Sequence, residues 1–162
     1  MATIMKHVNE LKDHVVKIRD NGNSIVMVNG CFDLFHAGHL DLLRVAKTHG
    51  DILIACVNSD TSIRRNKGDL RPVIGESDRI SIVAAICYVD FAILFDEQTQ
   101  AEIIFKITPD KIVKEAEYMK KEIAERSAID QSGCEIVFYE RSSDISTSAI
   151  IERMNMRVYQ KS

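Results

Sequence analysis

Tryptophan is absent from the 162 residues, and proline and glycine are scarce, with two and seven residues. No stretch therefore has the composition of a linker, and no repeat or low-complexity tract divides the sequence. We expect a single domain spanning residues 1–162. No membrane partner is expected, because no apolar run approaches the roughly 20 residues that cross a bilayer. The start of the chain also lacks a signal-peptide pattern, which favours a cytoplasmic location.

Charge and cysteine spacing exclude further classes of protein. The net charge is −3 and no basic stripe is present, so a nucleic acid is not expected as a partner. The cysteines are spread along the chain without a C-x-x-C pair, and three of the four lie within apolar runs (Cys31, Cys56, Cys87, Cys134). This spacing favours buried free thiols over a zinc site. No cluster of carboxylates suggests another protein-built metal site.

Short apolar runs alternate with segments of helical periodicity. Apolar residues between Ile4 and Ile18 recur at steps of three and four, which predicts a helical lead-in within residues 1–22. The runs at 24–28, 51–57, 91–95, 111–113 and 135–139 are typical of buried strands, and helical patterns cover 38–49, 76–88, 99–107, 119–132 and 146–156. The alternation predicts a Rossmann-like three-layer α/β/α fold with a five-stranded parallel sheet. Ligands bind such sheets beyond the carboxyl ends of the strands, at a topological switch point.

The loop after the first predicted strand carries the most unusual residues. It reads Asn29-Gly-Cys-Phe-Asp-Leu-Phe-His-Ala-Gly-His39. Gly30 allows a sharp turn close to a ligand, and Gly38, at the start of a helix, leaves room for a phosphate beside free N–H groups. His36 and His39 are three residues apart at this helix N-terminus, so both side chains can donate hydrogen bonds to the same phosphate.

The pattern G-x-F-D-x-x-H-x-G-H in this loop resembles the signature of the cytidylyltransferase-like nucleotidyltransferases. The resemblance implies that His36 and His39 stabilise the α-phosphate of a nucleoside triphosphate while a substrate phosphate attacks it in line. It also implies that the surrounding residues form part of the nucleotide site (Asn29, Gly30, Phe32, Asp33, Gly38).

A basic segment, Arg64 to Val73, follows the second predicted strand. Its four cations lie within eight residues and are interrupted by Gly68, which predicts a mobile positive loop able to neutralise a triphosphate. Val57-Asn-Ser-Asp60 followed by Lys67-Gly-x-x-Arg-Pro-Val is similar to the adenylyltransferases that make ADP-heptose from D-glycero-β-D-manno-heptose 1-phosphate. That similarity implies that ATP is the nucleotide and that Lys67 and Arg79 contact its phosphates.

Near the end of the sequence, Ser146 or Thr147 is a natural N-cap for a terminal helix. The segment resembles the second family signature, I-S-T-[ST]-x-I, with Arg141 just upstream. The resemblance implies that the helix N-terminus and its hydroxyl groups hold the β- and γ-phosphates (Ser146, Thr147, Ser148), and that Arg141 and Lys114 also bind the nucleotide. Capping and phosphate binding are compatible functions of the same residues.

One segment departs from the heptose-type pattern. Relatives usually have Lys-Gly-Gly-Asp-Tyr, whereas this sequence has Lys114-Glu115-Ala116-Glu117-Tyr118. Glu115 places a negative charge beside a polyanionic ligand, which costs free energy in a partly desolvated site. A rearranged loop, a different nucleotide or acceptor, and weak binding are the three interpretations.

The resemblances together predict transfer of AMP from ATP to D-glycero-β-D-manno-heptose 1-phosphate, with release of pyrophosphate. Mg²⁺ is expected to arrive with the nucleotide, and no nucleophilic side chain is needed. The first alternative is a cytidylyltransferase acting on glycerol 3-phosphate or another polyol phosphate, and the second is a nucleotide-binding module without turnover. Analogy with similar enzymes favours a homo-oligomer, a dimer or larger.

Overall fold

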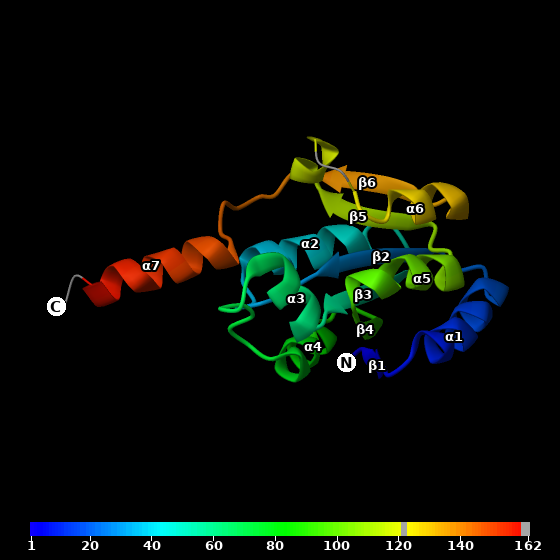
Figure 1. The fold of residues 1–162 in the computed structure, drawn as a ribbon. Helices are drawn as coiled ribbons and strands as arrows, with labels where there is room; N and C mark the ends of the chain where they lie inside the picture. The colour runs from blue at the N-terminus through cyan, green and yellow to red at the C-terminus, as the bar shows by residue number, and fades with distance from the viewer. Residues whose placement is uncertain (121–122, 160–162) are drawn as a thin grey trace.

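A parallel sheet forms the centre of the molecule (Figure 1). The computed structural model describes residues 1–120 and 123–159, leaving out the side chains of 97–99 and 158–159. The strands of this part are β1 (Thr3–Met5), β2 (Ile25–Gly30), β3 (Ile52–Asn58), β4 (Phe91–Phe95), β5 (Lys111–Glu115) and β6 (Glu135–Tyr139). Their order is β1-β4-β3-β2-β5-β6, and every pair of neighbours is parallel.

Helices connect the strands and cover both faces of the sheet. They are α1 (Val8–Asp20), α2 (Ala37–Lys47), α3 (Asp60–Lys67), α4 (Glu76–Ala85), α5 (Glu97–Ile107), α6 (Arg126–Ser132) and α7 (Thr147–Tyr159), with a 3₁₀ turn η1 (Ala116–Lys120). Among the described residues, no helix has the length and apolar composition needed to span a bilayer. The predicted three-layer Rossmann-like fold is thereby confirmed.

Alternating strand residues divide the core into two halves, because successive side chains of a strand point to opposite faces. Ile25 and Met27 of β2 face α1, α5 and α6, which contribute Leu11, Ile104 and Ile129 to that half. The other half contains Val26 and Val28, packed with side chains of α2 and α4 (Leu42, Leu43, Ala46, Ile80, Val83, Ala84). Burial on both faces explains why the central strands are continuous apolar runs.

The predicted number of strands and the extent of the N-terminal helix were wrong. Residues Thr3–Met5 form a sixth strand, paired with Phe91–Ile93 of β4, and the helix begins only at Val8. Three residues are too few for a period of two to be distinguished from a helical period. Their extended conformation depends on pairing with β4, nearly 90 residues away in the sequence, which local periodicity does not reveal.

Two other segments differ from their predictions. Arg64–Lys67 belong to α3 rather than to a mobile loop, and Ser59 caps this helix by accepting a hydrogen bond from the Ser62 backbone N–H (3.0 Å). Half of the residues of α3 are charged and only Ile63 is apolar, so apolar periodicity gives little signal. In the predicted helix 119–132, only Arg126–Ser132 forms an α-helix, and residues 121–122 lie outside the described part of the chain.

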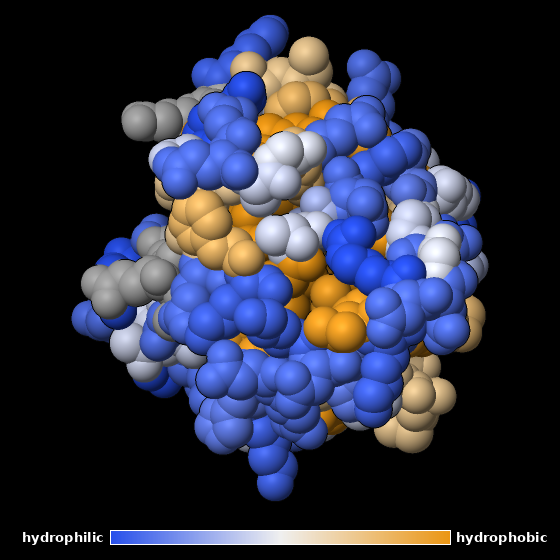
Figure 2. Space-filling view, turned by 90° about the vertical axis from the view of Figure 1, so that its right-hand side faces the viewer, coloured by the Kyte–Doolittle hydropathy of each residue, from blue (hydrophilic) through white to orange (hydrophobic). Residues whose placement is uncertain are grey.

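The strand order places a topological switch point between β2 and β5. From β2 the chain continues to β3 on one side, whereas β5 and β6 extend the sheet on the other. The strand arrows point toward the end of the molecule from which α7 projects (Figure 1). Figure 2 views the opposite end, where polar and charged residues surround a group of apolar residues near the middle. The carboxyl ends of β2 and β5 are therefore where a ligand is expected.

Candidate active site

A cavity of about 470 Å³ lies beyond the carboxyl ends of β2 and β5, at the switch point. Most of the residues predicted from the sequence line it together (Asn29, Gly30, Phe32, His36, His39, Lys67, Lys114, Arg141, Ser146, Thr147, Ser148). Asp33, Gly38 and Arg79 are not among the lining residues. The volume is within the range that small-molecule sites occupy in proteins.

His36 is the N-cap residue of α2, and its ring is held in one tautomer. The ring Nδ1 accepts a hydrogen bond from the Gly38 backbone N–H at 3.1 Å. Since a neutral imidazole carries its single proton on the other nitrogen, Nε2 of His36 is a donor. Burial and, to a smaller degree, Arg141 lower the pKa of His36, which favours this neutral form.

His39 stacks on His36, with ring centroids 3.8 Å apart and an angle of 22° between the ring planes. Burial is the main cause that lowers its pKa to about 3, and the neighbouring His36 adds to the effect. Phe32 and Phe35 also lie against the ring. Its Nδ1 is buried and lacks a hydrogen-bond partner among the described residues. The site thus holds two neutral imidazoles at the N-terminus of α2.

Gly38 is required by close packing around His36. A Cβ atom at this position would lie 3.0 Å from Cε1 of His36 and 3.2 Å from the Ile145 carbonyl oxygen. The loop before it is strained, because Phe32 and Leu34 have positive φ angles of 50° and 46°. Gly38 therefore supports the position of the His36 ring, although it does not line the cavity itself.

Asp33 lies beneath the cavity, where it fixes the loop after α3. Its carboxylate accepts hydrogen bonds from the backbone N–H groups of Val73 and Ile74 and from Nε of Arg71 (2.7 Å). Burial alone would raise the pKa of Asp33, but these donors outweigh it and the pKa is lowered. The predicted nucleotide contact through Asp33 is corrected to an indirect contribution, because its bond to Arg71 holds a cation at the cavity wall.

Arg79 was predicted to contact phosphates, but the structure places it away from the cavity. Its side chain is fully buried. Each of its guanidinium nitrogens donates to a protein acceptor: the carbonyl oxygens of Cys31, Asn58 and Ile74, and the carboxylate of Asp60. Arg79 therefore joins the loops that follow β2 and β3 to the segment before α4. The residues around Arg79 do not indicate that it is buried, because the same pattern is typical of a solvent-exposed helix arginine.

The hydroxyl groups at the start of α7 are partly used within the protein. Ser146 Oγ accepts from the Ala149 backbone N–H at 3.1 Å, which confirms the predicted N-cap. Thr147 donates to the Asp33 carbonyl oxygen at 2.8 Å and thus anchors α7 to the loop after β2. Ser148 lines the cavity from the first turn of the helix. The first turn of α7 thus lines the same cavity as the histidines.

Glu115, the main departure from the family pattern, forms an ion pair within the site. Its Oε2 lies 3.2 Å from Nε of Arg141. The negative charge of Glu115 beside the cavity is therefore compensated by the Arg141 guanidinium. A pair through Nε leaves the terminal amino groups of the guanidinium able to bind an anion.

Several residues that line the cavity were not predicted as site residues (Arg71, Gln100, Glu117, Tyr118, Glu125). Arg71 was part of the quoted basic motif, and its bond to Asp33 could not be foreseen. Gln100 and Glu125 lie within predicted helical patterns, where isolated polar residues normally indicate a solvent-exposed face. Only the packing of α5 and the segment before α6 against β5 brings them to the site.

Among the described residues, no three His, Cys, Asp or Glu side chains come together in a way that could hold a metal ion. The carboxylates nearest the cavity do not form a cage, because Glu115 is paired with Arg141 and Glu125 with Lys114.

Two imidazoles at the N-terminus of α2 and the first residues of α7 line one cavity at the switch point of a parallel sheet, and this arrangement suits the binding of nucleotide phosphates by a nucleotidyltransferase. Comparisons with known proteins agree with this class. The family model described as cytidylyltransferase-like matches residues 27–153, so the chain belongs to the cytidylyltransferase-like family. Membership of this family implies a nucleoside triphosphate as a substrate.

Curated relatives include the "Bifunctional protein HldE" of Alkalilimnicola ehrlichii, 41% identical over 145 residues, and that of Helicobacter acinonychis, 44% identical over 134 residues. The matches cover 90% and 83% of this chain but only 30% and 28% of those proteins. The chain thus spans less than a third of the curated relatives' length.

Two solved structures have a similar fold. One is the lipopolysaccharide core biosynthesis protein from Thermoplasma volcanium, with a TM-score of 0.65 and 30% identity, covering 75% of this chain and all of that chain. The other is pantothenate synthetase from Thermus thermophilus, with a TM-score of 0.61 over 85% of this chain and 61% of the other. At 13% identity, this second likeness concerns the fold alone.

Proposed function

We propose that the chain is an adenylyltransferase that transfers AMP from ATP to D-glycero-β-D-manno-heptose 1-phosphate, giving ADP-heptose and pyrophosphate. The observation that carries the proposal is the pair of stacked, neutral histidines in a cavity that also contains Lys67, Arg71 and Arg141. The heptose substrate is supported by the Lys67–Val73 motif and by the 41% identity to a bifunctional HldE protein. A 30% identical relative described as a lipopolysaccharide core biosynthesis protein also agrees with a sugar substrate.

The proposed reaction is an in-line displacement. An oxygen of the sugar phosphate attacks the α-phosphorus of ATP, a new P–O bond forms, and the bond to the β-phosphate oxygen breaks so that pyrophosphate leaves. Nε2–H of His36 and the ring of His39 donate hydrogen bonds to the α-phosphate oxygens, whose negative charge increases in the transition state. Because the imidazoles are already neutral and held in position, little reorganisation is needed.

Cations and helix termini bind the rest of the triphosphate. Lys67, Arg71 and Arg141 neutralise its charge, and Mg²⁺ enters as the MgATP complex and supplies further neutralisation. The first turn of α7, with Ser146, Thr147 and Ser148, binds the β- and γ-phosphates through its backbone N–H groups and the Ser148 hydroxyl. We further propose that this occurs in the cytoplasm, where ATP is available, and that the chain acts as one domain.

The test is release of pyrophosphate with Mg²⁺, offering ATP, CTP, GTP and UTP against heptose 1-phosphate and glycerol 3-phosphate. We expect release with ATP and heptose 1-phosphate only. Release only with CTP and glycerol 3-phosphate would retain the chemistry and replace the substrates. If nucleotide binds but no pair of substrates releases pyrophosphate, the proposal is wrong and the chain is a binding module.

A further inference from the structure

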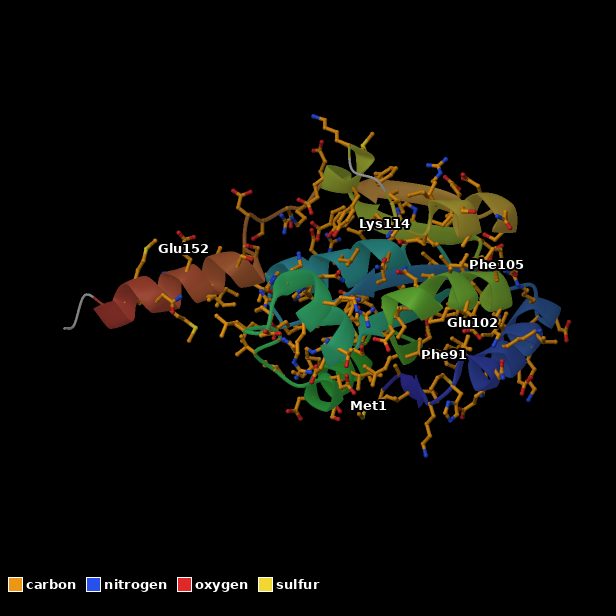
Figure 3. All side chains as sticks on the ribbon, in the orientation of Figure 1. Met1, Phe91, Glu102, Phe105, Lys114 and Glu152 are labelled. Atoms are coloured by element: carbon orange, nitrogen blue, oxygen red, sulfur yellow. The ribbon has the colours of Figure 1, made fainter. Side chains whose placement is uncertain are left out.

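Four polar side chains from separate segments meet at the floor of the cavity. Lys114 Nζ donates to Asn29 Oδ1 at 3.1 Å and to the Glu125 carboxylate, and Gln100 Nε2 donates to Glu125 Oε1 at 3.2 Å. Asn29 Nδ2 completes the polar cluster by approaching Gln100 Oε1 at 3.4 Å. Figure 3 labels Lys114, which lies on β5.

Three of the four side chains in the polar cluster are almost entirely removed from solvent, although they line the cavity, and Asn29 is partly buried. Gln100 is 4% exposed, and the side chains of Lys114 and Glu125 are 7% and 10% exposed. Burying a charged pair costs free energy that the attraction between the charges only just offsets, so the pair contributes little to the stability of the fold. Burial of polar groups beside an open cavity is instead expected where they orient a ligand.

The charges of the polar cluster suit a neutral ligand. Glu125 neutralises Lys114, so this pair adds no net charge to its end of the cavity. A phosphate group therefore gains little binding free energy from the polar cluster. Among the described residues, Oε2 of Glu125 accepts no hydrogen bond, and the Lys114 ammonium group has three protons for its two acceptors. Hydroxyl groups, which both donate and accept, match these remaining positions.

Tyr118 adds an aromatic surface to the same end. Its ring lines the cavity, and Nζ of Lys114 lies 5.6 Å from its centroid. An aromatic face packs against the C–H groups of a sugar ring, while the neighbouring carboxylate, amide and ammonium groups bind the ring hydroxyls. This combination is suited to a polyhydroxylated ring.

We propose that the polar cluster binds the ring hydroxyls of the acceptor sugar, with Glu125 accepting from them and Gln100 and Lys114 donating to them. The inference rests on the proposed function. It assigns Lys114 to the binding site of the acceptor sugar, whereas the sequence predicted that Lys114 binds the nucleotide. The ribose of the nucleotide offers the same hydroxyl chemistry. The acceptor is favoured because a nucleoside presents two ribose hydroxyls and a flat base, whereas the cluster gathers four hydrogen-bonding side chains.

The test compares Glu125→Gln with Glu102→Gln in the pyrophosphate-release assay. Glu102 pairs with Lys106 on the exposed side of α5, so it is a matched control away from the cavity (Figure 3). Glu125→Gln keeps the size of the side chain but loses its charge. We expect KM for heptose 1-phosphate to rise at least about tenfold and KM for ATP to change less than twofold. Glu102→Gln is expected to change neither value.

A second variant covers the case in which Glu125→Gln does not fold, since Lys114 would lose its buried counter-charge. Gln100→Met leaves the Lys114–Glu125 pair intact and removes only the amide, and the same selective rise in KM for the sugar phosphate is expected. Thermal melting checks that both variants are folded. Calorimetric titration of wild type and variants with ATP and with heptose 1-phosphate measures the two affinities without turnover.

Each outcome decides the inference. An equal rise in KM or dissociation constant for ATP would assign the polar cluster to the ribose and overturn it, as would unchanged values for both ligands. Absence of pyrophosphate release by the wild type would contradict the proposed function instead. In that case the titrations still decide: heptose 1-phosphate binding that Gln100→Met weakens supports the inference, and no binding by the wild type overturns it.

Discussion

At the scale of single residues, the two histidines of the cavity differ in what holds them. His36 is fixed by a bond to the backbone of its own helix, whereas His39 is held by packing between aromatic rings and the His36 imidazole. Burial keeps both neutral, which suits a donor to phosphate because no proton must be lost or gained before the nucleotide enters. The cost of that burial is an unpartnered Nδ1 on His39.

Replacing His39 by alanine should therefore affect turnover rather than folding. We expect kcat for pyrophosphate release to fall at least about 100-fold, because one preorganised donor to the transition state is lost. The melting temperature should change little, because the loss of the ring's packing is offset by the removal of a buried nitrogen without a hydrogen-bond partner among the described residues. His7→Ala, an exposed histidine before α1, is the control. Turnover of His39→Ala near the wild-type rate would contradict the proposed mechanism.

The lowered pKa of His39 also predicts how stability changes with pH. The folded protein keeps His39 neutral down to about pH 3, whereas the unfolded chain binds a proton below about pH 6.5. The free energy of unfolding should therefore fall as the pH is lowered, by up to about 2 kcal/mol from this group between pH 8 and 5. Urea titrations of wild type and His39→Gln at a series of pH values give the free energy of unfolding, and the two proteins are compared by its slope against pH.

The variant His39→Gln should lose less free energy of unfolding over this interval than the wild type, while His7→Gln should follow the wild type. Acidic side chains titrate mainly below pH 5, so they contribute little to the comparison. If the free energy of unfolding changes with pH in the same way for His39→Gln and the wild type, the His39 imidazole is not held neutral in the folded protein.

At the scale of elements, buried or partly buried side chains hold together the loops at the carboxyl ends of the strands. Asp33 holds the segment 71–74, Arg79 holds the loops after β2 and β3, and Thr147 ties α7 to the loop after β2. Asp33 and Arg79 do not line the cavity whereas Thr147 does, and the hydrogen bonds that all three make inside the protein keep the cavity-lining groups in place. A defined arrangement of donors is what electrostatic stabilisation of a transition state requires.

Arg79→Met tests whether this arginine supports the loops or contacts phosphate. Methionine has a similar length but leaves the carbonyl oxygens of Cys31, Asn58 and Ile74 without their donor. We expect the free energy of unfolding to fall by about 3 kcal/mol, measured by denaturant titration. Arg65→Met, an exposed arginine on α3, is the control. A rise in KM for ATP with unchanged stability would instead agree with a phosphate contact.

Helices and strands that are specified by residues close together in the sequence could be predicted. β2, β3 and β4 contain continuous apolar runs, β5 and β6 contain shorter ones, and the N-cap of α7 is a serine followed by helical periodicity. β1 and α3 could not be predicted, because one is stabilised by pairing with β4 and the other is a charged helix with a short apolar face.

The same distinction holds for the site. Residues in the two signature loops meet at the cavity, since both loops follow strand ends at the same edge of the sheet. Whether a residue faces the cavity or supports it from below depends on packing between distant segments. Asp33 and Arg79 are thus indistinguishable from ligand contacts in the sequence, and Gln100 and Glu125 resemble ordinary helix residues.

At the scale of the whole molecule, charge is distributed unevenly. The chain carries a net charge of −3, yet Lys67, Arg71 and Arg141 gather at the cavity beyond the strand ends. Binding of a polyanion must therefore depend on a local positive potential that outweighs the overall negative charge. Such a potential is concentrated where low-dielectric walls surround the cations, and dissolved salt screens it.

Lys67→Gln and Lys12→Gln remove the same charge at different places, the cavity and the exposed surface of α1. At low salt, Lys67→Gln should weaken MgATP binding about five- to tenfold in calorimetric titrations, because a charge-assisted contact to phosphate is lost. Lys12→Gln should change the dissociation constant less than twofold, since it alters only the net charge. At about 0.5 M salt the difference between Lys67→Gln and wild type should narrow as screening shortens the range of the potential. An equal effect of both substitutions would mean that net charge, rather than the cations at the strand ends, governs nucleotide binding.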